Sequence, residues 1–173
     1  GYWQSVFIDF DRLILNSPQL LFRFSSEEMA DTCAMHFRLG DYIDNPVYKE
    51  KYKELDVNYY RNALERIVMS FEVKTIIIFS DRIDRAKLIV NELQRIYKNI
   101  KFEFSEAQTA LRDFESILKC QHIVTANSSY SLQAATMKLL SKSTNKGMVV
   151  SPSEWFNPGF EKVINAHPAI IRL

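Results

Sequence analysis

The chain has 173 residues, a formal net charge of +1 and a hydrophobic fraction of 47%. This length fits one domain with a sizeable buried core. Because the charges nearly cancel, the composition does not indicate a partner recognised by bulk charge, such as a nucleic acid. The two cysteines, Cys33 and Cys120, lie in apolar runs, which favours buried free thiols over a disulfide framework. With four glycines, the chain contains neither common glycine-rich phosphate loop.

No signal peptide is visible, and no apolar run reaches the length of a membrane span. The first residue is Gly1 rather than methionine, so the chain is compatible with a fragment of a longer protein. Residues 1–30 are expected to form a helical lead-in segment, because their apolar residues fall on one helical stripe. Asp9 and Asp11 have the D-x-D spacing of metal-dependent nucleotide-sugar enzymes. On a helix, residues two apart point away from each other, so we expect a solvated face there and no metal site.

Strand-like and helix-like runs alternate from residue 32 to residue 150. The predicted strands are residues 32–35, 74–79, 100–104, 121–126 and 147–150, and the predicted helices are residues 57–71, 84–97, 107–118 and a last one opening at 127–131 and running to 139. This alternation predicts an α/β fold with a parallel sheet flanked by helices and right-handed crossovers. Residues 43–56 are expected to form a surface loop or a short helical excursion, long enough for a lid or an acceptor-binding loop.

Polar residues follow three of the predicted strands, where open α/β sheets bind their ligands. After the first strand, Arg38 has the side chain best shaped to hold a phosphate through two parallel hydrogen bonds. His36 can hydrogen-bond a base or a sugar. A local interpretation stays open, in which Arg38 and Asp41 only pair across a turn and Gly40 supplies the bend.

The other two polar segments allow similar alternatives. Ser80 and Asp81 either cap the following helix or contact a ribose or an acceptor. Asn127, Ser128 and Ser129 stand at the start of a predicted helix, where free backbone N–H groups and the positive end of the helix dipole favour phosphate. Ordinary N-capping is the alternative there.

Asp113 lies on the preceding predicted helix. A carboxylate is a natural acceptor for the N1–H and N2–H₂ groups of guanine, and an exposed helix charge is the alternative. His122 and His167 have no partners at metal-ligand spacing and are expected to be surface or core histidines. No serine or cysteine nucleophile with a partnering histidine can be placed.

Together these residues resemble the motifs of the α-1,2-fucosyltransferases and, more loosely, those of the α-1,6- and protein O-fucosyltransferases. The resemblance covers nearly the whole chain in the family's order, although each motif alone is weak. The matching segments are Gly1-Tyr2-Trp3-Gln4-Ser5, His36-x-Arg38-x-Gly40-Asp41-Tyr42, Phe79-Ser80-Asp81, Asp113, Cys120-x-His122-Ile123-Val124-x-Ala126-Asn127-Ser128-Ser129-Tyr130-Ser131 and Pro152-x-x-Trp155.

The resemblance implies a Rossmann-like domain over residues 31–173, the donor lobe of a GT-B-type glycosyltransferase. Such an enzyme would move L-fucose from GDP-fucose to a glycan hydroxyl, in an inverting, metal-independent α-1,2 reaction. GDP-fucose would be a substrate, and no cofactor is implied. By resemblance, Arg38 and Ser129 would hold the diphosphate, while His36 and Asp113 would contact the guanosine.

The rest of the expected site follows from the same motifs. Gly40, Ser80, Asp81, Asn127 and Ser128 would complete the donor-binding set. The expected catalytic residues are Arg38, Asp41 and Asp44. Arg38 would stabilise the charge that develops on the diphosphate. Asp41 and Asp44 are the carboxylates nearest to the motif, and an acceptor hydroxyl needs a base.

Two departures from the family pattern matter. A second arginine often follows the first, but here the position is Leu39, and the family's glycine-rich amino-terminal segment is absent. We therefore expect the first lobe to be missing or truncated. Three alternatives stay open: a fucosyltransferase of another linkage, a non-catalytic nucleotide- or glycan-binding module, and a protein–protein domain that uses an exposed aromatic loop at Trp155 and Phe156.

Overall fold

The computed structural model describes residues 28–107, 109–141, 147–164 and 166–173. Most of the expected lead-in segment, including Asp9 and Asp11, lies outside the described residues, so its helical character stays a prediction. At its end the expectation is wrong, because Met29 and Ala30 already belong to the first strand, β1 (Met29–Phe37).

Among the described residues, six parallel strands form one sheet in the order β3-β2-β1-β4-β5-β6. After β1 come β2 (Thr75–Ser80), β3 (Lys101–Phe104), β4 (Cys120–Val124), β5 (Val149–Ser151) and β6 (Ile171–Arg172). The strand order reverses between β1 and β4, which is where doubly wound sheets open a crevice for ligands. The last strand, β6, was missed by sequence analysis because two residues carry no periodic signal.

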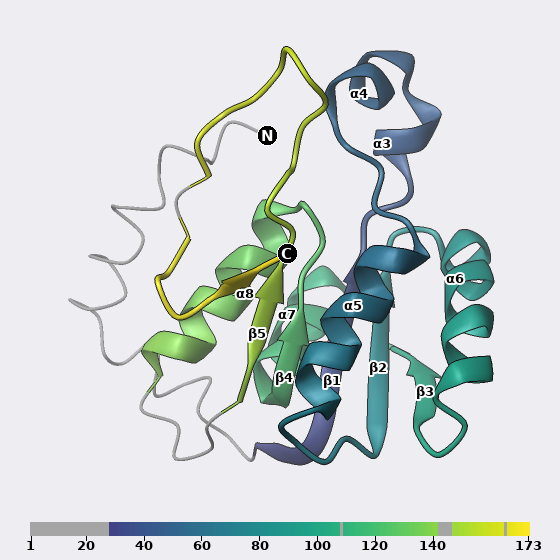
Figure 1. Ribbon diagram of the computed structural model, residues 1–173, viewed down its shortest axis with the longest axis vertical. Helices are drawn as coiled ribbons and strands as arrows, with labels where there is room; N and C mark the ends of the chain where they lie inside the picture. The colour runs from purple at the N-terminus through teal and green to yellow at the C-terminus, as the bar shows by residue number, and fades with distance from the viewer. Residues whose placement is uncertain (1–27, 108, 142–146, 165) are drawn as a thin grey trace.

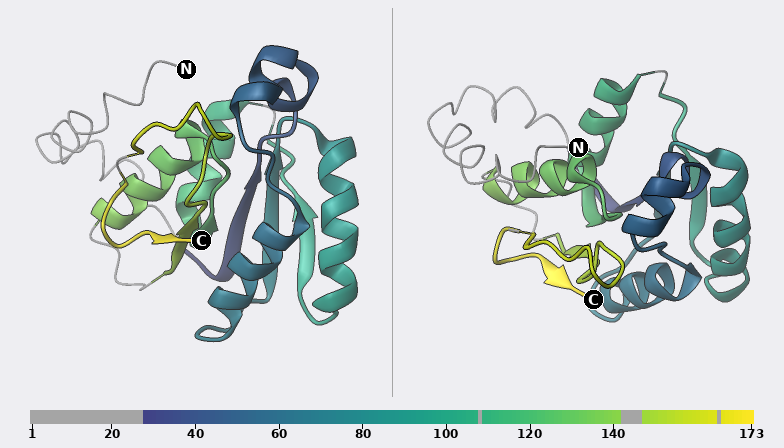
Figure 2. Two further views of the ribbon diagram at one scale, coloured as in Figure 1. Left: turned by 45° about the horizontal axis from the view of Figure 1, so that its top comes forward. Right: turned by 90° about the horizontal axis from the view of Figure 1, so that it is seen from above.

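Four long helices cover the two faces of the sheet (Figures 1 and 2). On one face lie α5 (Val57–Val68) and α6 (Ile83–Ile96), and on the other lie α7 (Ala110–Lys119) and α8 (Ser129–Leu140). The predicted α/β architecture, a parallel sheet flanked by helices, is therefore confirmed. No helix among the described residues combines the length and apolar character that crossing a membrane requires.

Helices α5 and α7 begin where the sequence supplies a capping side chain, that of Asp56 and that of Thr109. The carboxylate of Asp56 accepts hydrogen bonds from the backbone N–H groups of Asn58 and Tyr59, which fixes the first turn of α5. Its core face carries Tyr60 and Leu64 at helical spacing, and both are fully buried. Alternation along β1 then sorts side chains between the two faces of the sheet.

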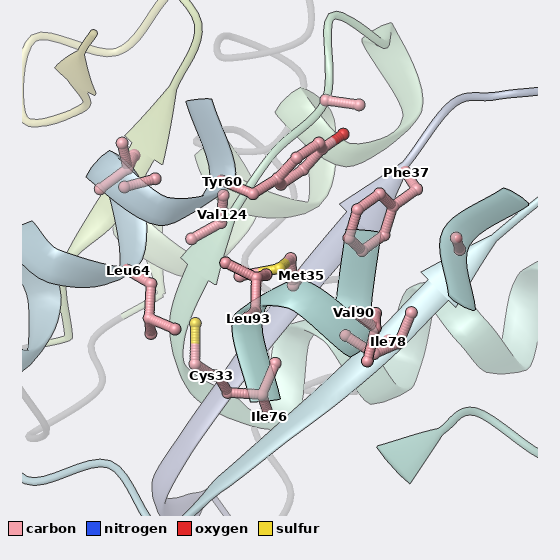
Figure 3. Packing of buried hydrophobic residues seen from close by; sticks show 14 of the residues in the cluster. Cys33, Met35, Phe37, Tyr60, Leu64, Ile76, Ile78, Val90, Leu93 and Val124 are labelled. Carbon is pink, nitrogen blue, oxygen red and sulfur yellow. The ribbon is translucent and has the colours of Figure 1, made fainter. Parts of the chain in front are cut away.

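Figure 3 shows the core on the α5–α6 face. Cys33, Met35 and Phe37 of β1 point into it, and the ring of Phe37 stacks on Tyr60 with centroids 4.1 Å apart. Cys120 belongs to the core on the opposite face. Both cysteines are buried and free, which confirms that prediction.

The segment expected as a loop or helical excursion contains two short helices, α3 (Asp41–Asp44) and α4 (Pro46–Lys51). They stand beyond the carboxyl ends of the strands, at the top of Figure 1. The side-chain amide of Asn157 donates to three backbone carbonyls at the carboxyl-terminal end of α4, those of Lys49, Glu50 and Tyr52. The carboxyl-terminal loop thus anchors the segment, which is not what a freely opening lid requires. The expectation that this loop exposes its aromatic residues is wrong, because Trp155 and Phe156 are 2% and 6% exposed and pack into the core.

Candidate functional site

A pocket of about 320 Å³ opens beyond the carboxyl ends of the strands, within the size range of small-molecule sites. Its walls come from the ends of β1 and β2 and from the segments that lead into α7 and α8. The lining residues are His36, Arg38, Phe79, Ser80, Asp81, Ala107, Thr109, Ala110, Asp113, Ser128 and Tyr130.

The pocket brings together six of the eleven residues predicted from the sequence. These are His36, Arg38, Ser80, Asp81, Asp113 and Ser128. The other five do not line it, namely Gly40, Asp41, Asp44, Asn127 and Ser129. The strand ends therefore converge as expected, but proximity in sequence to a motif does not guarantee a place in the pocket.

Arg38 is the cation of the pocket wall and is held by two carboxylates. One terminal nitrogen lies 2.9 Å from the carboxylate oxygens of Asp41, and the other lies 3.2 Å from Oδ2 of Asp81. Its guanidinium also lies over the ring of Tyr42, 5.4 Å from the centroid. Arg38 thus pairs with Asp41 across the turn and also lines the pocket, and its contact with a phosphate stays a prediction.

Asp81 binds the backbone of the same turn. Its Oδ1 accepts from the N–H of Leu39 at 2.8 Å, and its Oδ2 accepts from the N–H of Gly40 at 3.1 Å. A Cβ atom on Gly40 would lie 2.8 Å from Oδ2 of Asp81, so a larger residue at this position would displace the carboxylate. Gly40 supports the site through Asp81 without lining the pocket itself.

Asp41 and Asp44 form ion pairs beside the pocket. Asp41 starts α3 and pairs with Arg38. Asp44 accepts from Arg82 at 2.6 Å and from Arg85 at 2.5 Å. Their predicted role as bases stays a prediction, and the geometry gives both a structural role in fixing the α3 turn.

His36 is 7% exposed, and its Nδ1 atom has no hydrogen-bond partner among the described residues. Burial, and then the positive charge of Arg38, lower its pKa to about 3. The imidazole is therefore neutral near pH 7 and offers a hydrogen bond rather than a charge. A buried unpaired nitrogen in a pocket wall is a natural contact for a polar ligand.

At the amino end of α8, Ser128 is the N-cap residue, and its side chain makes no capping hydrogen bond. The first-turn N–H groups of the helix are consequently not satisfied by that hydroxyl. Asn127 does not cap either, since its buried amide donates to the carbonyls of Lys53 at 2.7 Å and Trp155 at 3.2 Å. It ties the β4–α8 turn to the loops beside it.

Asp113 lies in the first turns of α7 and is oriented by a neighbour. The hydroxyl of Ser105 donates to its Oδ1 at 2.6 Å and accepts from the N–H of Ala107 at 3.2 Å. Asp113 is thus a pocket residue rather than only an exposed helix charge. Ser105 follows β3, a position that the sequence analysis did not single out.

Five lining residues were missed by the sequence analysis as contacts. They are Phe79, Ala107, Thr109, Ala110 and Tyr130. Tyr130 stood within a quoted motif, and its hydroxyl donates to the carbonyl of Ala110 at 2.5 Å, which joins α8 to α7. The small residues that lead into α7 have no distinctive chemistry, so only the fold identifies them.

The departure at Leu39 has a structural explanation. Leu39 is 3% exposed and belongs to the core on the α5–α6 face. Its carbonyl accepts from Arg85 at 2.6 Å. An apolar side chain suits this buried position, and Arg38 alone carries positive charge from the motif into the pocket.

Comparison with known proteins gives a consistent result. The sequence model of glycosyl transferase family 11 matches residues 14–169. The O-antigen biosynthesis glycosyltransferase WbnK of Escherichia coli is 31% identical over 129 residues, which are 75% of this chain and 40% of that protein. The alpha-1,2-colitosyltransferase of Escherichia coli is 24% identical over 170 residues, which are 90% of this chain and 55% of that protein.

The chain thus spans about half the length of these relatives. The family match extends over all the strands but the last and over every element that lines the pocket. On this evidence the chain belongs to glycosyl transferase family 11.

Proposed function

We propose that this chain forms the donor-binding lobe of a GT-B-type glycosyltransferase that moves L-fucose from GDP-fucose to a glycan hydroxyl in α-1,2 linkage, with inversion and without a metal. One observation carries the proposal. A single pocket at the switch point of the sheet combines Arg38, the amino end of α8 and the carboxylate of Asp113. These are the groups that a diphosphate and a guanine require.

In this proposal the diphosphate lies between Arg38 and the start of α8, near Ser128 and Ser129. When the bond between the sugar and the diphosphate breaks, negative charge grows on the leaving GDP. Arg38 and the free N–H groups of α8 would stabilise that charge at the moment it forms. Arg38 is therefore the residue with the strongest claim to a catalytic role.

The guanosine would lie toward α7. The carboxylate of Asp113 would accept from the base, and the neutral His36 would hydrogen-bond the base or the ribose. Ser80 lines the pocket at the end of β2, where its hydroxyl could meet the donor. We assign no acceptor base, since Asp41 and Asp44 are both engaged with arginines.

Colitose is a second candidate for the transferred sugar, because one relative is named as an alpha-1,2-colitosyltransferase. Both candidates share the proposed nucleotide site and differ only at the sugar. A transfer assay that offers the fucose donor and the corresponding colitose donor in parallel would separate them.

The proposal is tested first by binding. Calorimetry with GDP, ADP and UDP on the intact chain is expected to show saturable GDP binding and weaker binding of the other two. Arg38→Ala and Asp113→Asn should each weaken GDP binding by roughly tenfold or more, because each removes a hydrogen bond that involves a charged group. Asp84→Asn is the matched control, since Asp84 pairs with Arg82 and does not line the pocket. Absence of GDP binding at millimolar concentration would overturn the proposal.

A further inference from the structure

Asp81 lines the pocket, yet its carboxylate is engaged almost entirely by the protein. It accepts the N–H groups of Leu39 and Gly40 and pairs with Arg38 at 3.2 Å. An ionised carboxylate offers about four acceptor sites, and these contacts use three of them. A carboxylate so engaged has little capacity left for a ligand, and its charge opposes a diphosphate.

The sheet register explains how this contact arises. Phe37 of β1 pairs with Ser80 of β2 in adjacent parallel strands, so the turn after β1 lies beside the residue after β2. The hydroxyl of Ser80 accepts from the N–H of Arg82 at 3.0 Å and closes the turn around Asp81. The absent side chain of Gly40 then leaves room for the carboxylate against the backbone.

Arg38 is fixed in orientation by this arrangement. Asp81 holds one terminal nitrogen and Asp41 holds the other, so the plane of the guanidinium is defined on both sides. A guanidinium has five N–H donors in a rigid fork. The two carboxylates contact only the terminal nitrogens, which leaves donors for an anion.

We infer that Asp81 is a positioning residue, which presets the β1–α3 turn and the guanidinium of Arg38 for a diphosphate and acts on the donor only through them. This inference rests on the proposed function. It replaces the expectation that Asp81 contacts the ribose or the acceptor. Preorganisation of this kind lowers the cost of ordering a charged side chain when the ligand binds.

The test compares three probes on the wild type and on Asp81→Asn, using calorimetry at one ionic strength. The probes are GDP, guanosine and inorganic pyrophosphate. Asp81→Asn should lose roughly 10-fold to 100-fold in affinity for GDP and pyrophosphate, the range for hydrogen bonds to charged groups. Guanosine affinity should change by no more than about twofold, which an unfolded or distorted variant would not allow.

A double-mutant cycle shows whether Asp81 acts through Arg38. In the Arg38→Ala background, Asp81→Asn should cost less GDP affinity than it does alone, because its main target is gone. Gly40→Ala is a second perturbation, since its Cβ would press on the carboxylate of Asp81. It should lower pyrophosphate affinity in the same direction. Asp84→Asn, outside the pocket, again serves as the control.

The outcomes separate the two claims. A wild type that binds pyrophosphate but not GDP counts against the proposed donor, and loss of that binding in Asp81→Asn still supports the inference. A wild type that binds neither overturns both. If Asp81→Asn keeps GDP affinity within about twofold, if guanosine affinity falls equally, or if the two single losses simply multiply, Asp81 is not a positioning residue for Arg38.

Discussion

Asn127 is expected to stabilise the fold rather than to bind phosphate, and Asn127→Ala tests this directly. The side chain is 2% exposed, and its amide donates to the carbonyls of Lys53 and Trp155. Alanine removes both bonds and leaves two carbonyls without this donor. At about 1 kcal/mol net for each bond, unfolding should become easier by about 2 kcal/mol. For a chain of this length that corresponds to a fall in Tm of about 4–8 °C.

Circular dichroism during heating, together with urea titration, measures the change. Asn91→Ala is the matched control, because Asn91 is an exposed residue in the middle of α6 and its loss should shift stability by no more than about 0.5 kcal/mol. At a temperature where Asn127→Ala is folded, its GDP affinity should stay within about twofold of wild type. An unchanged Tm combined with a large loss of GDP affinity would refute the reasoning and restore Asn127 as a donor ligand.

Three further predictions concern titration, ion pairs and base recognition. Burial lowers the pKa of His36 to about 3 and that of His122 to about 4. Below pH about 6.5 these histidines are therefore protonated in the unfolded chain but still neutral in the folded chain. Urea titration should show stability falling on acidification from pH about 6.5 to 4, by up to about 1.4 kcal/mol per pH unit for each histidine, and less steeply in His36→Asn; a pH-independent stability would contradict this. Asp44→Asn should change the unfolding free energy by less than about 1 kcal/mol and GDP affinity by no more than about twofold, since the ion pairs of Asp44 with Arg82 and Arg85 are half exposed. A large loss of turnover with unchanged GDP binding would instead support Asp44 as the catalytic base. Ser105→Ala should weaken GDP binding by about threefold to tenfold and leave pyrophosphate binding unchanged in calorimetry, because its hydroxyl bonds Asp113 and the N–H of Ala107, at the wall proposed for the guanine; equal losses for both probes would exclude that role.

The sequence predicted the class of fold because the signals are local. The continuous apolar run in β2 and the helical spacing of Tyr60 and Leu64 depend only on neighbours in the chain. The same is true of the polar residues that follow three of the predicted strands. The two-residue strand β6 was beyond this method, since it exists only through its pairing with β5.

The site was predicted in part, and the division has a physical cause. Residue type and position at the end of a strand correctly indicated Arg38 and His36 as pocket residues, although His36 still belongs to β1. The same reasoning could not distinguish Ser128, which lines the pocket, from its neighbour Asn127. The side-chain amide of Asn127 instead donates to two backbone carbonyls, those of Lys53 and Trp155. Hydrogen-bond partners that lie 74 residues apart leave no mark on the local sequence.

By itself the sequence determined which residues could do the chemistry, because side-chain type and strand-end position are written along the chain. Only the tertiary structure decided which of them line a common pocket and which hold the others in place. The register of β1 against β2 places Asp81 beside the backbone of Gly40 and the guanidinium of Arg38. That assignment depends on distances across the sheet, which no order of residues along one strand can specify.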